Sequence, residues 1–262
     1  MKSIIRILPV LFIKNGLIVR SEKFEKHQII GNVLNQAKRL NDYEADELIY
    51  IDISRNDKYD LGRDDLSIKS QTDIVEIINE ISKVCFMPLS FGGKIRSCKD
   101  AVIRIRAGAD KIIINSILYD NVSEVKNIVK EVGSQAVVAS IDYKQIKDNI
   151  ICFKNFGKIN TKVQLNDLIK KVEDLGVGEI FLQNIDRDGT KKGFDIDLIN
   201  SVNEKTSLPV IACSGAGDEN DFFQATKIKN LSAIAAGNYF NFKERSYPTV
   251  KKFLKGQKIN VR

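Results

Sequence analysis

Asp142 is the carboxylate in this sequence that is best placed for proton transfer. It directly follows six small or apolar residues, 136–141, a run that is typical of a buried strand. We therefore expect its side chain to lie at the end of that strand, partly out of water. Partial desolvation raises the pKa of a carboxyl group, so Asp142 could act as a general acid or base. The alternative is that Asp142 caps the turn after the strand.

Glycine-rich turns follow several expected strands and could hold anions. The segments 87–93 and 208–215 resemble each other and end in such turns. Glycine lets backbone N–H groups approach an oxyanion, and the helix that follows adds partial positive charge. Two related turns favour two phosphate sites and a ligand with a phosphate at each end, whereas tight turns alone are the alternative. The residues assigned to phosphate or substrate binding are Gly93, Lys94, Asn115, Ser116, Asp188, Gly189, Gly215 and Gly237.

Four charged residues stand at the beginnings of expected strands. They are Arg6, Glu47, Lys111 and Glu179, two cations and two anions. In a closed barrel these side chains would form a ring at the bottom. Burying unpaired charges is costly, so the ring must be mutually paired. The sequence alone allows a simple polar plug that closes the core.

The scaffold that positions these residues follows from alternating segments. Apolar runs rich in Ile, Val and Ala alternate with segments of helical spacing, such as 73–84, 122–132, 165–175 and 222–227. Eight strands alternating with about eight helices predict an α/β fold of the (β/α)8 barrel type, in which ligands bind at the carboxyl ends of the strands. A doubly wound open sheet is the alternative, but the turn 14–16 is not a phosphate-binding loop. The expected strands are 4–13, 47–53, 86–91, 111–115, 136–142, 179–183, 209–213 and 233–236.

The chain also repeats itself in halves. Besides the glycine turns, 50–54 resembles 184–188 and 11–14 resembles 141–144, which predicts two similar half-barrels. No linker divides them, so residues 1–262 are expected to form one domain. Residues 54–70 are expected to form a mobile loop at the mouth. His27 is expected in the loop after the first strand, without a catalytic role.

Composition excludes several other classes of protein. The chain has 43% hydrophobic and 29% charged residues, and no window resembles a membrane span. The apolar N-terminus reads as a strand rather than a signal peptide. The chain has four cysteines without a CxxC motif and a single histidine, which argues against a metal site and against Ser-His or Cys-His catalysis. The cysteines are typical of a reduced, cytoplasmic protein. No cofactor is expected. The net charge of +7 favours anionic ligands, but the scattered lysines do not indicate nucleic-acid binding.

Four stretches carry a resemblance to a known family. Residues 45–48 (ADEL), 108–111 (GADK), 133–138 (GSQAVV) and 185–191 (IDRDGTK) resemble the cyclase subunit of imidazole glycerol phosphate synthase, the HisF family, and the likeness covers almost the whole chain. The resemblance implies a (β/α)8 barrel that binds a substrate with two phosphates across its mouth. It also implies a glutaminase subunit on the opposite face, which supplies ammonia through the barrel.

The resemblance assigns roles to individual residues. Arg6, Glu47, Lys111 and Glu179 match the family's ammonia gate, and Asp142 matches one of its two catalytic aspartates. The other aspartate falls on Phe12, which cannot transfer a proton. Lys94 replaces the last glycine of the first phosphate turn, where its ammonium could bind a phosphate directly.

These departures leave three hypotheses open. The first is an ammonia-relaying subunit, like a branch of the family that works with a glutaminase and a sugar amidotransferase to form acetamidino sugars for surface polysaccharide such as O-antigen. The second is a genuine cyclase of histidine biosynthesis, which converts the ribulosyl substrate and ammonia into imidazole glycerol phosphate. The third is a non-catalytic binder of a phosphorylated small molecule.

Overall fold

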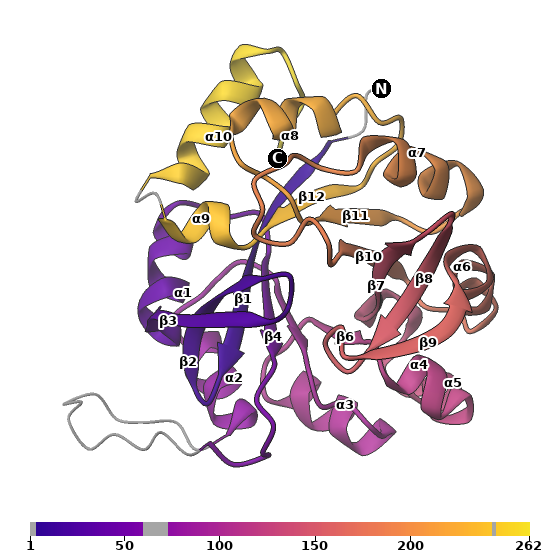
Figure 1. The fold of residues 1–262 in the computed structure, drawn as a ribbon. Coiled ribbons are helices and arrows are strands. Elements are labelled where there is room, and N and C mark those ends of the chain that lie inside the picture. The colour runs from indigo at the N-terminus through magenta and orange to yellow at the C-terminus, as the bar shows by residue number, and fades with distance from the viewer. Residues whose placement is uncertain (1–3, 60–72, 243–244) are drawn as a thin grey trace.

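Eight parallel strands close into a barrel in this computed structural model, which describes residues 4–59, 73–242 and 245–262. The barrel order is β1, β4, β5, β6, β7, β10, β11 and β12, and β12 pairs with β1 to close the ring. Helices cover the outside (Figure 1). The predicted (β/α)8 barrel is therefore confirmed, and the open doubly wound sheet is excluded.

The barrel elements agree closely with the predicted segments. The barrel strands are β1 (Arg6–Lys14), β4 (Leu48–Asp52), β5 (Leu89–Gly92), β6 (Lys111–Ile114), β7 (Val137–Ile146), β10 (Glu179–Asn184), β11 (Val210–Cys213) and β12 (Ala233–Ala236). The helices are α1 (Val33–Asp42), α2 (Ile74–Ser82), α3 (Cys98–Arg106), α4 (Ile117–Asp120), α5 (Val122–Val132), α6 (Leu165–Asp174), α7 (Ile196–Lys205), α8 (Glu219–Ala225), α9 (Asn238–Phe242) and α10 (Ser246–Gly256), with a 3-10 turn at Ser134–Ala136.

Alternation along the strands separates two apolar clusters. On β1, Ile7 and Leu11 join the large cluster, whereas Leu8, Val10 and Phe12 belong to a second, smaller one. The large cluster contains buried side chains of the helices, and the smaller one is built mainly from barrel strands. The large cluster therefore fills the layer between the barrel and the helices, and the smaller one fills the barrel interior. This division follows because successive side chains of a strand point to opposite faces.

Two antiparallel hairpins extend the barrel and were not predicted. The first, β2 (Leu17–Glu22) with β3 (Lys26–Asn32), follows β1, and the second, β8 (Asn149–Lys154) with β9 (Ile159–Gln164), follows β7. Both lie on the same face of the barrel (Figure 1). Because they occupy equivalent places after strands 1 and 5, they support the division into two similar half-barrels.

Some predicted details are corrected by the structure. His27 lies in strand β3, not in a loop, because the chain turns back at Asn15-Gly16 and pairs again. Helix α8 begins at Glu219, before the predicted residue 222, since Asp218 caps it by accepting the backbone N–H of Asp221. Residues 60–70 of the predicted mouth loop lie outside the described residues. In the described part of the chain, no helix has the length and apolarity needed to cross a bilayer.

Candidate functional site

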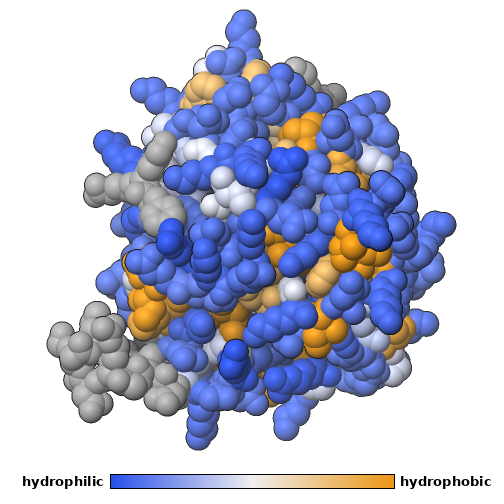
Figure 2. Space-filling model, viewed as in Figure 1, coloured by the Kyte–Doolittle hydropathy of each residue, from blue (hydrophilic) through white to orange (hydrophobic). Residues whose placement is uncertain are grey.

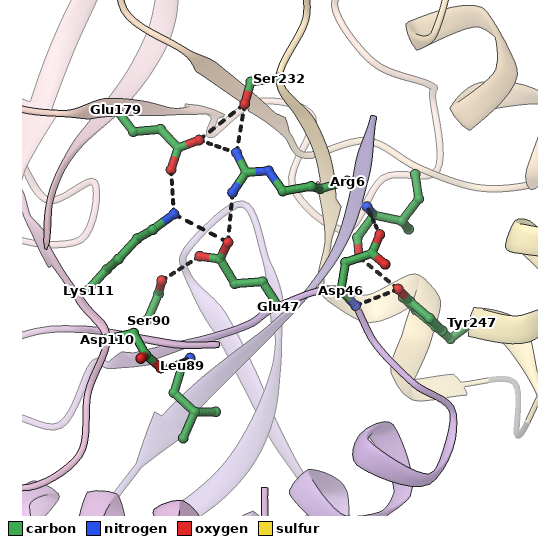
Figure 3. Close-up of polar contacts among 11 residues, drawn as sticks. Arg6, Asp46, Glu47, Leu89, Ser90, Asp110, Lys111, Glu179, Ser232 and Tyr247 are labelled. Atoms are coloured by element: carbon green, nitrogen blue, oxygen red, sulfur yellow. Dashed lines mark hydrogen bonds and ion pairs between the residues drawn. The ribbon is translucent and has the colours of Figure 1, made fainter. Parts of the chain in front are cut away.

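The four charged residues at the strand starts meet in one network at the bottom of the barrel (Figure 3). Arg6 donates to Glu47 at 2.7 Å (Nη1 to Oε2) and also bonds Glu179. Lys111 bridges the same two carboxylates from the other side, at 3.3 Å to Glu47 and 3.0 Å to Glu179. The charges of the ring therefore cancel, as burial requires.

Two serines that the sequence did not single out complete this ring. Ser90 on β5 donates its hydroxyl to Glu47 at 2.6 Å, and Ser232 before β12 accepts from Arg6 at 2.7 Å. Burial alone would lower the pKa of Arg6, but the nearby Glu179 and Glu47 carboxylates raise it above its ordinary value. The guanidinium stays charged, and each carboxylate has several donors.

Helix α10 fixes the strand starts beside the ring. The carboxylate of Asp46 accepts from the backbone N–H of Ile7 at 2.7 Å and from Lys251 at 2.6 Å. The hydroxyl of Tyr247 donates to the carbonyl of Ile7 and accepts from the N–H of Asp46 (Figure 3). These bonds tie β1 to the segment before β4, so Arg6 and Glu47 are held in register.

The barrel interior beyond the ring is apolar. Its side chains belong to the smaller cluster and come from every barrel strand except β5, among them Leu8, Val10, Ile49, Ile113, Val138, Phe181, Ile211, Ala233 and Ala235. An apolar column disfavours an ion such as ammonium far more than a small neutral molecule. The barrel interior between the ring and the mouth is thus lined by apolar side chains.

Asp142 lies at the opposite end of this column, with only 3% of its surface exposed. Its Oδ1 accepts from Ser140 at 2.9 Å and from Gln183 at 3.1 Å. Burial raises the pKa of Asp142 to about 7, although these two hydrogen bonds favour the ionised form. The carboxyl group lines the mouth cavity and can exist in either protonation state near neutral pH.

Phe12, the aromatic residue at the other expected proton-transfer position, is buried in an aromatic cluster. Its ring meets Phe24 at 6.1 Å and Phe156 at 5.4 Å between centroids, both edge to face. Phe24 and Phe156 sit at the tips of the two hairpins. The described residues bring no carboxylate into hydrogen-bonding contact with Asp142, whose partners here are Ser140 and Gln183.

The predicted binding residues fall into two separate cavities at the mouth. A large cavity of about 980 Å³ is lined by Asp142 together with Gly93, Lys94, Asn115 and Ser116. A small one of about 60 Å³ is lined by Phe12 together with Asp188, Gly189, Gly215 and Gly237. Strands 1 and 5 stand opposite each other in an eight-strand ring. The predicted binding residues therefore divide into a group beside Asp142 and a group beside Phe12.

Close backbone packing explains two of the glycines without any ligand. A Cβ at Gly93 would lie 2.1 Å from the carbonyl oxygen of Asp52, and one at Gly215 would lie 2.1 Å from that of Gly193. Both glycines also have positive φ, at +98° and +102°. The tight-turn interpretation therefore suffices at these positions, and phosphate binding remains a prediction.

Lys94 does not present a free ammonium group to the mouth. Its Nζ pairs with the fully buried carboxylate of Asp52 at 3.1 Å and also bonds the carbonyl of Asn56. The hydroxyls of Ser54 and Tyr59 donate to the same carboxylate. To bind a phosphate as the predicted point charge, the Lys94 ammonium would thus have to leave its internal partner, Asp52.

Three other predicted binding residues hold the hairpins. Asp188 accepts from the hydroxyl of Ser21 at 2.7 Å and from the N–H of Phe24 at 3.3 Å. Asn115 donates its side-chain amide to the carbonyls of Ser140 and Phe153, and Ser116 accepts the N–H of Asn155. These contacts form the walls of the mouth. Among the residues that the structure describes, no cluster of three His, Cys, Asp or Glu side chains could hold a metal ion.

Comparison with known proteins places this geometry in a family. A sequence model described as histidine biosynthesis protein matches residues 6–246. The chain is 34% identical to imidazole glycerol phosphate synthase subunit HisF of Hydrogenobaculum sp. (strain Y04AAS1) over 258 residues, 98% of each chain. It is 35% identical to the HisF subunit of Chloroherpeton thalassium and 33% identical to that of Saccharolobus solfataricus, again over 98% of each chain.

Proposed function

From the premise that this chain belongs to the histidine biosynthesis protein family and is HisF-like, we propose that it is the synthase subunit of a glutamine-dependent amidotransferase complex. In this proposal a glutaminase docks on the bottom of the barrel, and ammonia passes through the ring of Arg6, Glu47, Lys111 and Glu179 to the mouth. The whole chain, 1–262, acts as one barrel domain.

The observation that carries the proposal is a difference between the two ends of the barrel. At the bottom the charged ring is complete and paired, and beyond it lies an apolar interior that neutral ammonia can enter more readily than ammonium. At the mouth no carboxylate of the described residues bonds to Asp142, and Phe12 fills the other expected position. Losing one group of an acid–base pair costs about 10²–10⁴ in rate.

The bottom face carries features that fit a partner protein. Phe86, just before β5, has 88% of its surface exposed, and Ile4 beside β1 has 56%. A neighbouring open cavity of about 790 Å³ is lined by Tyr43, Asp46 and Phe86, among others. Exposed large apolar side chains next to a cavity are typical anchor points of protein interfaces. This supports a glutaminase on this face.

The proposed use of the ammonia is acetamidino-sugar formation for surface polysaccharide. There, nitrogen replaces the oxygen of an acetamido group, and the elements of water leave. A separate sugar amidotransferase would catalyse this step, because Phe12 stands at the second expected proton-transfer position. The chain then acts as the conduit between two enzymes.

A second candidate, a genuine imidazole glycerol phosphate cyclase, is favoured by one observation. Asp142 has a pKa of about 7 and lines the large mouth cavity, as a general acid or base should. In this case a different group would replace the missing aspartate. Relatives that carry the HisF name support this candidate as well.

One pair of assays separates the two candidates. Glutamate release by the glutaminase is measured with and without this chain, and imidazole glycerol phosphate formation is measured from the ribulosyl substrate and ammonium salt. The relay predicts a stimulated glutaminase and no cyclase turnover. Cyclase turnover that is abolished by Asp142→Asn would refute the relay, whereas an unstimulated glutaminase together with no cyclase turnover would refute both and leave a phosphate-ligand binder.

A further inference from the structure

We infer that the mouth face, formed by the tips of the β2–β3 and β8–β9 hairpins and the rim of the large cavity, is a docking surface for a second protein with an acidic surface. This inference rests on the proposed function, because that protein is the enzyme which receives the ammonia. Below, this surface is called the hairpin face and comprises residues 14–32 and 144–164 with Arg55 and Arg96.

Charge is the first feature that identifies the partner. Seven Lys or Arg residues line the large cavity, against three Asp or Glu. Two of the three acids, Asp52 and Asp142, are buried below the rim. The exposed side chains of Lys14, Lys23 and Lys158 have no ion-pair partner among the described residues. A rim of unpaired cations attracts an acidic partner and excludes a basic one.

These cations come from three different elements that meet where the hairpin tips join, and not from a single glycine turn. Lys23 and Lys158 stand at the tips of different hairpins, and Lys14 ends strand β1. Lys94, the basic residue nearest the first glycine turn, is already paired with Asp52. The separate small cavity at Gly215 measures only about 60 Å³. The rim therefore suits a broad acidic surface better than a compact bisphosphate.

Exposed apolar side chains on the same hairpins point to a protein rather than a nucleic acid. Ile29 on β3 is 52% exposed, Ile146 at the end of β7 is 38% exposed, and Ile159 on β9 is 43% exposed. In the described residues, β3 pairs only with β2, and β9 pairs only with β8. Figure 2 shows apolar patches between hydrophilic residues on this face. Exposed isoleucines, two of them on the edge strands β3 and β9, are contact points that a protein can cover.

The hairpin face is held in place before any partner arrives. The rings of Phe24 and Phe156 join the two tips, with centroids 4.3 Å apart. Asp188 and Asn238 hold the first hairpin through Ser21, and Ser116 holds the second through Asn155. A preorganised surface loses little conformational entropy on binding. A protein seated there would also cover the cavity beside Asp142, so that ammonia does not escape into solvent.

Binding between this chain, in complex with its glutaminase, and the sugar amidotransferase of the same organism tests the inference. Lys23→Glu with Lys158→Glu reverses two rim charges. Lys126→Glu with Lys130→Glu makes the same net change on exposed positions of helix α5, on the outer wall of the barrel. We expect the rim pair to weaken binding about tenfold or more and the α5 pair to change it less than about twofold. Glutaminase stimulation should be unchanged in both.

The possible outcomes separate the docking surface from the proposed function. If the rim double variant and the α5 double variant bind the amidotransferase with equal affinity, the proposed docking surface is wrong. Loss of binding to a free sugar nucleotide in the rim pair, with unchanged affinity for the amidotransferase, would overturn it in favour of a small anionic ligand. If the unaltered complex fails to bind the amidotransferase at all, the proposed relay itself is wrong.

Discussion

Phe24 and Phe156 stack face to face, with ring centroids 4.3 Å apart and planes only 6° apart. One ring comes from each hairpin tip, and the backbone of both residues has positive φ, at +59° and +53°. Such a conformation costs about 1–2 kcal/mol for a residue with a side chain. The stacked pair also contacts Phe12 edge on. An aromatic cluster therefore occupies the side of the mouth opposite Asp142.

The first prediction concerns Phe12. Phe12→Asp should lower the free energy of unfolding by about 3–5 kcal/mol, because it leaves a cavity and a carboxylate among aromatic rings. Phe12→Leu, which keeps an apolar side chain, should cost about 1–1.5 kcal/mol. Chemical denaturation followed by circular dichroism measures both. The control is Phe86→Asp on the exposed bottom face, where the change should stay within about 0.5 kcal/mol.

A Phe12→Asp protein that is as stable as the unaltered chain would show that this position tolerates an acid. Cyclase activity gained by the same substitution would also show that this position tolerates an acid. We expect neither, because the two hairpin tips would still meet at Phe24 and Phe156.

The second prediction concerns the charged ring. Glu179→Gln leaves Arg6 and Lys111 to share Glu47, and we expect a loss of about 1–3 kcal/mol in the free energy of unfolding, since both cations keep some exposure. The substitution should also reduce the share of glutamine-derived ammonia that reaches an acceptor. Glu204→Gln on exposed helix α7 is the matched control and should leave both quantities unchanged. An unaffected Glu179→Gln protein would mean that the ring is dispensable.

The third prediction follows from the raised pKa of Asp142. Folded Asp142 titrates at about 7, well above an unfolded aspartate at about 3.9, so the folded state holds the extra proton between these two values. Stability should therefore fall by up to about 1.4 kcal/mol per pH unit as the pH rises through this window, and level off above it. Asp142→Asn keeps the hydrogen-bond acceptor but cannot ionise.

The difference in free energy of unfolding between the Asp142→Asn protein and the unaltered chain should thus grow in favour of the variant from pH 4 to pH 7. Urea denaturation across this range measures it. A gap that stays constant with pH would show that the pKa of Asp142 is ordinary. A gap of opposite slope would show a lowered pKa.

The fourth prediction concerns Lys94, whose backbone is left-handed with φ of +54°. Lys94→Ala and Lys94→Gly both remove the ion pair with Asp52, which leaves a buried carboxylate without its cation. Only glycine adopts this φ without strain, so the glycine variant should be about 1 kcal/mol more stable than the alanine variant. Thermal unfolding of both proteins compares them. If the Lys94→Ala protein is the more stable of the two, backbone strain at this position is negligible.

The barrel could be predicted from the sequence because its strands are nearly continuous apolar runs. Buried parallel strands such as 209–213 and 233–236 have this pattern, and regular alternation with helices leaves few other folds. The ring residues could be selected as well, since a charge directly before an apolar run must lie at the start of a strand. Their mutual contacts required the strand register, which the structure supplies.

The hairpins were missed although the sequence contains a signal for the first one. Asn15-Gly16 between two apolar runs is a typical two-residue hairpin turn, and both residues have positive φ here. The contact between Phe24 and Phe156 could not be predicted, because it joins residues from different half-barrels. The pairing of Lys94 with Asp52 depends in the same way on the packing of neighbouring strand ends.

The most direct test of the conduit follows the nitrogen itself. Glutamine labelled with ¹⁵N in its amide is supplied to the glutaminase, this chain and the sugar amidotransferase, in a medium with excess unlabelled ammonium. If ammonia travels through the barrel, the acetamidino sugar carries the ¹⁵N label despite that excess. A product whose nitrogen matches the unlabelled medium, or label that appears in imidazole glycerol phosphate when the ribulosyl substrate is added, would contradict the relay.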